Sequence, residues 1–226
     1  MHTILMAGGK GRRFLVDIEK PFLNISGRPI IEIILDSLID LSLDNTIDKI
    51  IVCTTTYTPI TERFVLRLAS KREDLSIIRT SGKGYIEDLQ ECINYLSLRE
   101  PFLYMSADIP LFDSEILRYI ISIYKKVEKD ALAVFMQKEV YDKYKIKTDL
   151  ILEYNNENIV PTGINIIDGS YIDEEQEEYK LILGLKDIRK VPTLAYLAFN
   201  INYVENYIKF IKLYKQNSCK MGKLTK

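Results

Sequence analysis

Short apolar runs alternate with apolar stripes of helical spacing over the first 136 residues, and this alternation limits the possible folds most. The runs are too short for helices and predict buried strands over residues 3–7, 49–53, 75–78, 102–105 and 131–136. Between them, apolar residues recur every three or four positions and predict helices over residues 29–41, 60–68, 86–96 and 116–127. Such repeated units predict an α/β fold, a three-layer sandwich with a mainly parallel (mixed) sheet.

The pattern loosens after residue 136. Residues 137–158 are rich in Lys, Asp, Tyr and Asn and predict an irregular excursion. Further along, a strand with a turn at its start is predicted over residues 159–167, a second strand over 191–199 and a final helix from 204 onward.

No segment has the composition of a flexible linker, so we expect a single domain over residues 1–226. Within it, residues 1–136 carry the strand–helix units and residues 137–205 form an irregular second part. Residues 206–226 form a C-terminal helix and a basic tail.

Charge and histidine content exclude several classes of protein. The 31 basic and 32 acidic residues give a net charge of −1, so nucleic acid is not an expected partner. The only histidine, His2, leaves Ser/His/Asp catalysis, Cys/His catalysis and multi-histidine metal sites almost without material. No apolar run approaches about 18 residues and no secretion signal is present, so we expect a cytoplasmic protein without stable membrane insertion. The oligomeric state stays open.

Three cysteines, Cys53, Cys92 and Cys219, are far apart in the sequence. Their odd number and their spacing indicate neither a disulfide framework nor a structural zinc site. We expect reduced, mostly buried thiols.

The connection after the first predicted strand combines glycines with basic residues. It runs from Ala7 through Gly8, Gly9, Lys10, Gly11, Arg12 and Arg13, and Lys20 follows before Pro21. Glycines let backbone N–H groups approach an anion, and the basic side chains offset the charge of a polyphosphate. A tight turn without a ligand is the alternative. The spacing matches neither the dinucleotide-binding fingerprint nor the Walker A motif, so NAD binding and a P-loop kinase are disfavoured.

Asp108 ends the predicted strand over residues 102–105. Ligands of open parallel sheets bind beyond the carboxyl ends of strands, so Asp108 is expected to face the same crevice as the glycine-rich loop. A carboxylate there suits Mg²⁺, which prefers oxygen ligands. A helix cap or a turn before Pro110 is the alternative structural role.

Two further segments carry glycines at positions where a ligand could approach. Ser81, Gly82 and Gly84 form a turn after a predicted strand that could offer backbone groups to a base or ribose, and Lys83 could reach a phosphate. A helix-capping turn explains the same residues. Gly163 lies in a strand of bulky residues, where glycine marks either close approach of a ligand or a bulge.

The glycine-rich loop resembles the G-G-x-G-x-R and K-P signature of nucleotidyltransferases, enzymes that attack the α-phosphate of a nucleoside triphosphate and expel pyrophosphate. The matching residues are Gly8, Gly9, Gly11, Arg13, Lys20 and Pro21. Asp108 resembles the metal-holding residue of this MobA-like superfamily. Asn200 and Asn202 resemble its N-x-N-T element, which implies that the Asn202 side chain also binds the metal, although an ordinary helix cap would account for it too.

Residues 80–93 and the segment from Val160 to Asn165 are similar to the archaeal GTP:adenosylcobinamide-phosphate guanylyltransferases. The resemblance implies a Rossmann-like nucleotidyltransferase fold, Mg²⁺ as cofactor, and GTP and adenosylcobinamide phosphate as substrates. It implies that Arg13, Lys20 and Asp108 are catalytic and that the two glycine-containing loops, Gly163 and Asn165 bind nucleotide. Nucleotidyltransferases acting on molybdopterin, sugar phosphates or polyol phosphates share the loop and Asp108, and a non-catalytic GTP-binding module is a further alternative.

Overall fold

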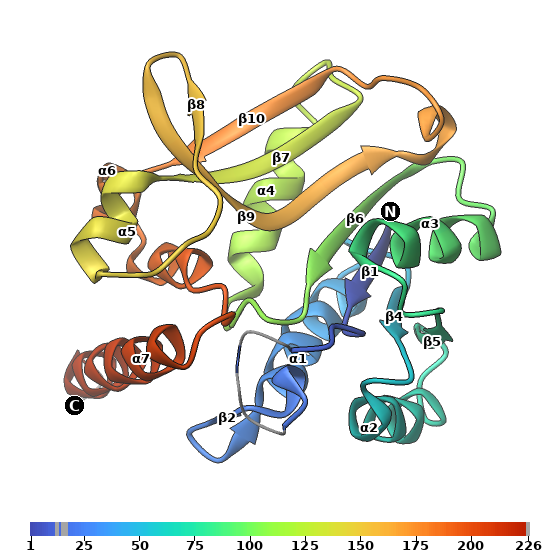
Figure 1. The fold of residues 1–226 in the computed structure, drawn as a ribbon, viewed down its shortest axis with the longest axis horizontal. Coiled ribbons are helices and arrows are strands. Elements are labelled where there is room, and N and C mark those ends of the chain that lie inside the picture. The colour runs from blue at the N-terminus through green and yellow to red at the C-terminus, as the bar shows by residue number, and fades with distance from the viewer. Residues whose placement is uncertain (12–13, 15–17, 225–226) are drawn as a thin grey trace.

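A mixed sheet forms the centre of the protein in the computed structural model, which describes residues 1–11, 14 and 18–224. Over this part of the chain the sheet has eight strands, in the order β10-β7-β9-β6-β1-β4-β5, with β8 paired to β9 (Figure 1). The strands are β1 (His2–Met6), β4 (Ile50–Thr54), β5 (Leu75–Arg79), β6 (Pro101–Ser106), β7 (Ala131–Gln137), β8 (Leu152–Tyr154), β9 (Glu157–Asp168) and β10 (Glu178–Leu183).

Strand direction divides the sheet into two parts. β6, β1, β4 and β5 are mutually parallel, and β10 is parallel to β7. β9 lies between β6 and β7 and is antiparallel to both of them. The α/β class with a mainly parallel, mixed sheet is thereby confirmed.

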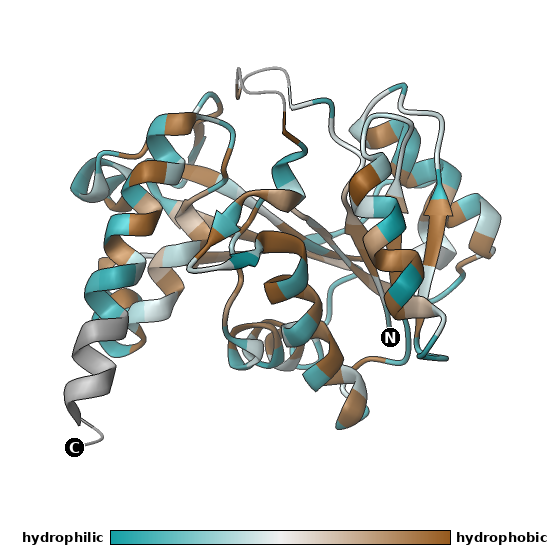
Figure 2. Cartoon of the chain, turned by 90° about the horizontal axis from the view of Figure 1, so that it is seen from below, coloured by the Kyte–Doolittle hydropathy of each residue, from teal (hydrophilic) through white to brown (hydrophobic). Residues whose placement is uncertain are grey.

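Helices follow most strands and cover the sheet. They are α1 (Ile30–Leu43), α2 (Pro59–Ala69), α3 (Tyr85–Leu96), α4 (Ser114–Tyr124), α5 (Lys138–Tyr144), α6 (Leu185–Lys190) and α7 (Val204–Leu224). Short 3-10 helices lie at η1 (Lys20–Phe22), η2 (Gly169–Tyr171) and η3 (Pro192–Ala198), and a small hairpin joins β2 (Asn24–Ile25) to β3 (Arg28–Pro29). Hydrophobic and hydrophilic residues alternate along the helices (Figure 2), as expected when one side of each helix faces the sheet.

Alternation along β1 shows how the sheet is covered on both faces. Leu5 belongs to the large core with α1 and α4, whereas Ile4 and Met6 belong to a second core with α3. Neighbouring side chains of a strand point to opposite faces, so a strand buried on both sides must be apolar throughout. This explains why the strand sequences are continuous apolar runs.

The predicted strand over residues 191–199 is wrong, because η3 occupies this segment. Leu194, Ala195, Tyr196, Leu197 and Ala198 are all buried there. A helix buried on every side shows no polar stripe, and its sequence therefore has the same apolar appearance as a buried strand.

The irregular excursion predicted over residues 137–158 contains regular elements, α5 and β8. The strand predicted over residues 159–167 is present as β9, which begins at Glu157 directly after a turn at Asn155 and Asn156. β10 and α6 follow and were not predicted.

The expectation that all three cysteines are reduced is also wrong for two of them. Cys53 and Cys92 form a disulfide between β4 and α3. Both residues belong to the core that α3 makes against the sheet, and both are almost fully buried. The packing of α3 thus brings together two residues 39 positions apart, which spacing in the sequence does not reveal.

Among the described residues, no helix combines the length and apolar character needed to cross a membrane.

Candidate active site

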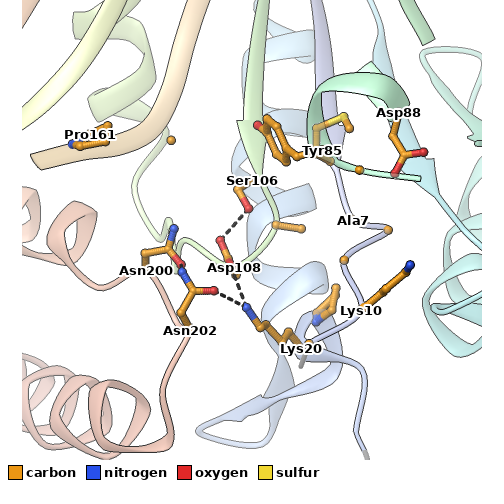
Figure 3. A pocket seen from close by; sticks show the side chains of 18 of the residues that line it. Ala7, Lys10, Lys20, Tyr85, Asp88, Ser106, Asp108, Pro161, Asn200 and Asn202 are labelled. Carbon is orange, nitrogen blue, oxygen red and sulfur yellow. Dashed lines mark hydrogen bonds and ion pairs between the residues drawn. The ribbon is translucent and has the colours of Figure 1, made fainter. Parts of the chain in front are cut away.

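The loops at the carboxyl ends of the parallel strands surround one cavity of about 770 Å³. β1 leads into the glycine-rich loop, β5 into Thr80–Gly84 and β6 into Asp108, and all of these segments contribute to its lining. The opposite side is lined by residues of β9 and of the later half of the chain, among them Pro161 and Asn200 (Figure 3). The cavity therefore lies where ligands of open α/β sheets bind.

The glycine-rich loop packs directly against the loop after β4. The Gly8 carbonyl accepts a hydrogen bond from the Thr55 hydroxyl at 2.7 Å, and a Cβ at Gly8 would lie only 2.3 Å from Thr55 Cγ2. Only glycine permits this approach. Ala7, Gly8, Gly9, Lys10 and Gly11 all line the cavity.

Two basic residues predicted for this loop, Arg12 and Arg13, lie outside the described residues. Of the described lysines, Lys10 places its ammonium 4.5 Å from the centre of the Tyr57 ring. This contact holds a cation at the rim of the cavity beside the backbone of the loop.

Lys20, Asp108 and Asn202 meet although they are far apart in the sequence (Figure 3). The Lys20 ammonium donates to Asp108 Oδ2 at 3.2 Å and to Asn202 Oδ1 at 2.5 Å. The side chains of the charged pair are only 12% and 14% exposed. The side-chain oxygens of Asp108 and Asn202 thus converge on one cation, the Lys20 ammonium, at the wall of the cavity.

Neighbouring side chains hold the Asp108 and Asn202 side chains in place. The Ser106 hydroxyl donates to Asp108 Oδ1 at 2.6 Å, and the Asn202 amide donates to Asn200 Oδ1 at 2.6 Å. The Ile201 N–H donates to the Asp108 carbonyl at 2.9 Å and ties the two segments together. Asp113, and not Asp108, caps helix α4, so the helix-cap alternative for Asp108 is not what the structure shows.

Glu19 fixes the position of Lys20. Its carboxylate accepts from the backbone N–H groups of Ile60 and Thr61 at 2.6 and 2.7 Å, and from the Thr61 hydroxyl at 2.6 Å. These groups belong to the first turn of α2, where unpaired N–H groups favour an anion. The chain immediately before Lys20 is thereby anchored to a helix.

The loop after β5 is ordered by acidic residues of α3. The Ser81 N–H and hydroxyl donate to the two oxygens of Glu91 at 2.8 and 2.6 Å, and these bonds lower the pKa of Glu91. The Gly82 N–H donates to Asp88 Oδ1 at 2.8 Å. Ser81 does not line the cavity, and its hydrogen bonds go to Glu91 of helix α3. Gly82, Lys83 and Gly84 do line the cavity.

A bulge in β9 brings Gly163 to the cavity. Ala133 of β7 pairs with Asn165, but Phe135 pairs with Pro161, so β9 carries extra residues between these pairs. Gly163 lies in this bulge at φ +86°, a conformation that favours glycine, and a Cβ there would lie 3.3 Å from Ile109 Cδ1. The bulge considered for Gly163 is therefore confirmed, and Gly163 and Asn165 both line the cavity.

Comparison with known proteins decides the family. Residues 3–163 match the MobA-like NTP transferase domain. The chain is a MobA-like NTP transferase. It is 34% identical over 207 residues to the adenosylcobinamide-phosphate guanylyltransferase of Methanocaldococcus jannaschii, a match that covers 89% of this chain and 91% of the relative.

Solved structures of other proteins have the same fold as this MobA-like transferase. A UDP-glucose pyrophosphorylase complexed with UDP-glucose superposes with a TM-score of 0.64 at 16% identity, over 96% of this chain and 98% of that chain. HddC from Yersinia pseudotuberculosis superposes with a TM-score of 0.62 at 14% identity, over 94% and 99% of the two chains. The Rossmann-like nucleotidyltransferase fold is thus confirmed. The family match and the curated relative show that the protein is a nucleotidyltransferase.

The chemistry of the donor set in this MobA-like transferase fits a magnesium ion. Asp108 and Asn202 each direct an oxygen at the same cation, the Lys20 ammonium. A carboxylate oxygen and an amide oxygen are hard ligands of the type that Mg²⁺ takes from proteins, with phosphate oxygens and water completing the shell. His2, Asp48 and Glu100 also lie close together, but His2 begins β1 and so lies at the other end of that strand.

Sequence reasoning missed several residues of the cavity in this MobA-like transferase. They are Thr80, Tyr85, Asp88, Tyr104, Ser106, Tyr141, Lys147, Thr148, Asp149, Leu150, Pro161 and Tyr203. Ser106 could have been noticed two positions before Asp108 on the strand that carries it. Lys147 has no local signal, because it lies in the segment that reads as irregular.

Proposed function

We propose that this nucleotidyltransferase transfers GMP from GTP to adenosylcobinamide phosphate, giving adenosylcobinamide-GDP and pyrophosphate. The observation that supports this type of reaction is that Asp108 and Asn202 converge on one cation beside the glycine-rich loop. The similarity to the Methanocaldococcus jannaschii guanylyltransferase along nearly the whole length of both chains supports the choice of substrates.

The bond changes are those of a direct phosphoryl substitution. An oxygen of the acceptor's phosphate forms a bond to the α-phosphorus of GTP. The bond from that phosphorus to the oxygen that bridges the α- and β-phosphates breaks. Pyrophosphate leaves with the electron pair. The acceptor phosphate is already ionised at neutral pH, so no general base is needed and the scarcity of histidine is no obstacle.

The chain contributes positioning and positive charge to this reaction. The backbone N–H groups of Gly8, Gly9 and Gly11 cradle the triphosphate, and Lys10 and Lys20 offset its charge. Arg12 and Arg13 are assigned to the same polyphosphate from the sequence motif. The loop with Gly82, Lys83 and Gly84 is assigned to the nucleoside, and Gly163 and Asn165 form the wall beside it.

Magnesium is the cofactor that we assign to Asp108 and Asn202. When bound, it supplies a Lewis acid that stabilises the negative charge developing on the phosphates. In the structure Lys20 donates to both of these oxygens, and we assign its charge to the reacting phosphate. As the reaction consumes GTP, we assign it to the cytoplasm.

Pyrophosphate release tests the proposal. The purified protein with Mg²⁺ is given GTP, ATP, CTP or UTP, each with and without adenosylcobinamide phosphate. Release that requires both GTP and the corrinoid is the expected result. Release with a sugar phosphate or molybdopterin instead would assign a different acceptor, and tight nucleotide binding without release from any acceptor would indicate a binding module.

A further inference from the structure

We propose that Lys147 binds the phosphate of the acceptor and that the adjoining apolar residues Leu150–Leu152 carry its apolar body. This inference rests on the proposed function and deepens it, because it names the part of the cavity where the second substrate binds. The substrate class is a phosphate monoester attached to a large, partly apolar group.

Lys147 occupies the side of the cavity opposite the nucleotide loops. It lies between α5 and β8, and Thr148 and Leu150 line the cavity with it. In Figure 1 this segment lies beyond β9, whereas the proposed nucleotide loops at residues 8–11 and 82–84 follow β1 and β5 on the other side of β6. A phosphate held at Lys147 would therefore enter from the side that the triphosphate does not use.

A buried side chain fixes the backbone of Lys147. Asn206 of α7 is only 1% exposed, and its Oδ1 accepts from the Lys147 N–H at 2.9 Å while its amide donates to the Lys147 carbonyl at 2.8 Å. The same amide lies 3.4 Å from the Asn200 carbonyl. This double hydrogen bond holds an exposed loop residue at a defined place relative to Asn200 and its neighbour Asn202.

An aromatic ring holds the ammonium of Lys147. It lies 4.1 Å from the centre of the Tyr203 ring, and Tyr203 directly follows Asn202. The Tyr203 hydroxyl donates to Asp149, so the same ring also ties down the loop beyond Lys147. A cation on an aromatic face keeps its other hydrogen-bond donors for an anion. Prepositioning of this kind lowers the entropic cost of binding a phosphate.

Three consecutive aliphatic side chains continue this surface outward. Leu150, Ile151 and Leu152 are 51%, 47% and 39% exposed, and Leu150 belongs to the cavity lining. β8, which begins at Leu152, forms the projecting hairpin with β9 in Figure 1. An exposed apolar stretch that begins three residues after a fixed cation matches an acceptor with an anionic phosphate and a large apolar body. A small sugar phosphate has no group to cover it.

The test compares Lys147→Met with Lys143→Met. Lys143 also has its ammonium over a ring, that of Tyr144, but it is not in the cavity lining. With Mg²⁺, pyrophosphate release is measured against adenosylcobinamide phosphate at saturating GTP, and against GTP at saturating corrinoid. Loss of a charge-assisted hydrogen bond predicts an acceptor KM raised about tenfold or more in Lys147→Met, with the GTP KM nearly unchanged. Lys143→Met keeps both constants.

Direct binding supplies a second readout. In the presence of a GTP analogue with a non-cleavable bridge between its α- and β-phosphates, calorimetry compares adenosylcobinamide phosphate with the same corrinoid lacking its phosphate. The phosphorylated form binds the wild type more tightly, and this preference disappears in Lys147→Met. The double variant Ile151→Ser, Leu152→Ser binds both corrinoids more weakly and still prefers the phosphorylated form.

The outcomes separate the two proposals. Unchanged acceptor KM and unchanged phosphate preference in Lys147→Met, in an enzyme that transfers GMP to the corrinoid, would overturn the role of Lys147 alone. Unchanged corrinoid affinity in the double serine variant would overturn the role of the apolar stretch. A wild type that binds and uses neither corrinoid would overturn the proposed function and, with it, the occupant named here.

Discussion

The ammonium of Lys20 lies 3.2 Å from Oδ2 of Asp108, and it also contacts the side-chain oxygen of Asn202. These residues are 88 and 182 positions from Lys20 in the sequence. A lysine thus occupies the position toward which the two proposed metal donors point. The pair is mostly shielded from water, so replacing one partner leaves an uncompensated charge on the other.

Replacing Asp108 with asparagine is expected to lower turnover about 100-fold or more while the protein stays folded. The substitution keeps the size of the side chain but removes the negative charge that holds a cation. Pyrophosphate release at saturating substrates measures the loss, and circular dichroism checks the fold. Asp142→Asn, on the exposed face of α5, is the matched control. Turnover equal to wild type in Asp108→Asn would remove this residue from the metal site.

Replacing Lys20 with methionine is expected to lower turnover and to strengthen the stabilising effect of Mg²⁺. In the wild type, the ammonium competes with the metal for oxygens of Asp108 and Asn202; in the variant, these oxygens have no lysine partner. The melting temperature is measured with and without Mg²⁺, and the metal-induced rise is larger in Lys20→Met. Lys49→Met, an exposed lysine at the other end of β4, keeps the wild-type rise. Equal rises in all three proteins contradict the competition.

Gly8→Ala is expected to destabilise the protein by about 1–3 kcal/mol and to weaken GTP binding, since the new Cβ would meet Thr55 Cγ2 at 2.3 Å. Gly9→Ala is the control, because nothing lies within 4 Å of a Cβ at that position. Adding Thr55→Ser to Gly8→Ala removes the clashing methyl group and keeps the hydroxyl, so part of the stability returns. Urea unfolding compares these three variants and the single variant Thr55→Ser with the wild type. An additive double variant with no recovery would show that this contact is not the cause.

The disulfide between Cys53 and Cys92 is expected to stabilise the protein by about 4 kcal/mol, the chain-entropy value for a loop of 39 residues. Reductant lowers the free energy of unfolding of the wild type and has no effect on Cys92→Ala. Cys219→Ala stays sensitive to reductant. Alkylation of the unfolded, unreduced protein labels one thiol of the three cysteines. Three labelled thiols, together with insensitivity to reductant, would mean that the bond is absent.

Stability is expected to fall as the pH rises above about 10. Burial raises the pKa of Tyr141 above its ordinary value of 10.0, because the folded protein disfavours the phenolate. The unfolded chain loses this proton near pH 10 while the folded chain keeps it, so higher pH favours unfolding. Urea unfolding from pH 8 to 11 shows the loss, and Tyr141→Phe reduces it. Tyr95→Phe, which is 77% exposed, behaves as wild type; an equal slope in Tyr141→Phe would refute this cause.

Much of the fold is predictable from the sequence because buried parallel strands and one-sided helices have different apolar periods. β1, β4, β5, β6 and β7 all lie where the pattern indicates. η3 was misread because its residues are buried on every side. β10 begins with exposed Glu178 and directly follows an acidic run, so its apolar residues are too few to be noticed.

Some residues of the candidate site are likewise predictable from the sequence, and others are not. Gly8, Asp108 and the loop at Gly82 lie directly after strands, where topology alone brings them to one edge. Lys147 depends on Asn206 of a distant helix for its position, and nothing in its own neighbourhood of the sequence indicates that partner. The disulfide likewise depends on how α3 packs.

The place of β9 in the sheet has a consequence for synthesis of the chain. β6 carries Asp108 at its end, and its partner on one side, β9, is complete only at residue 168. Asn202 follows later still. A chain emerging from the ribosome therefore displays the glycine-rich loop long before it holds both oxygen donors. The nascent protein would thus carry the loop proposed to hold the triphosphate before it carries both proposed metal ligands.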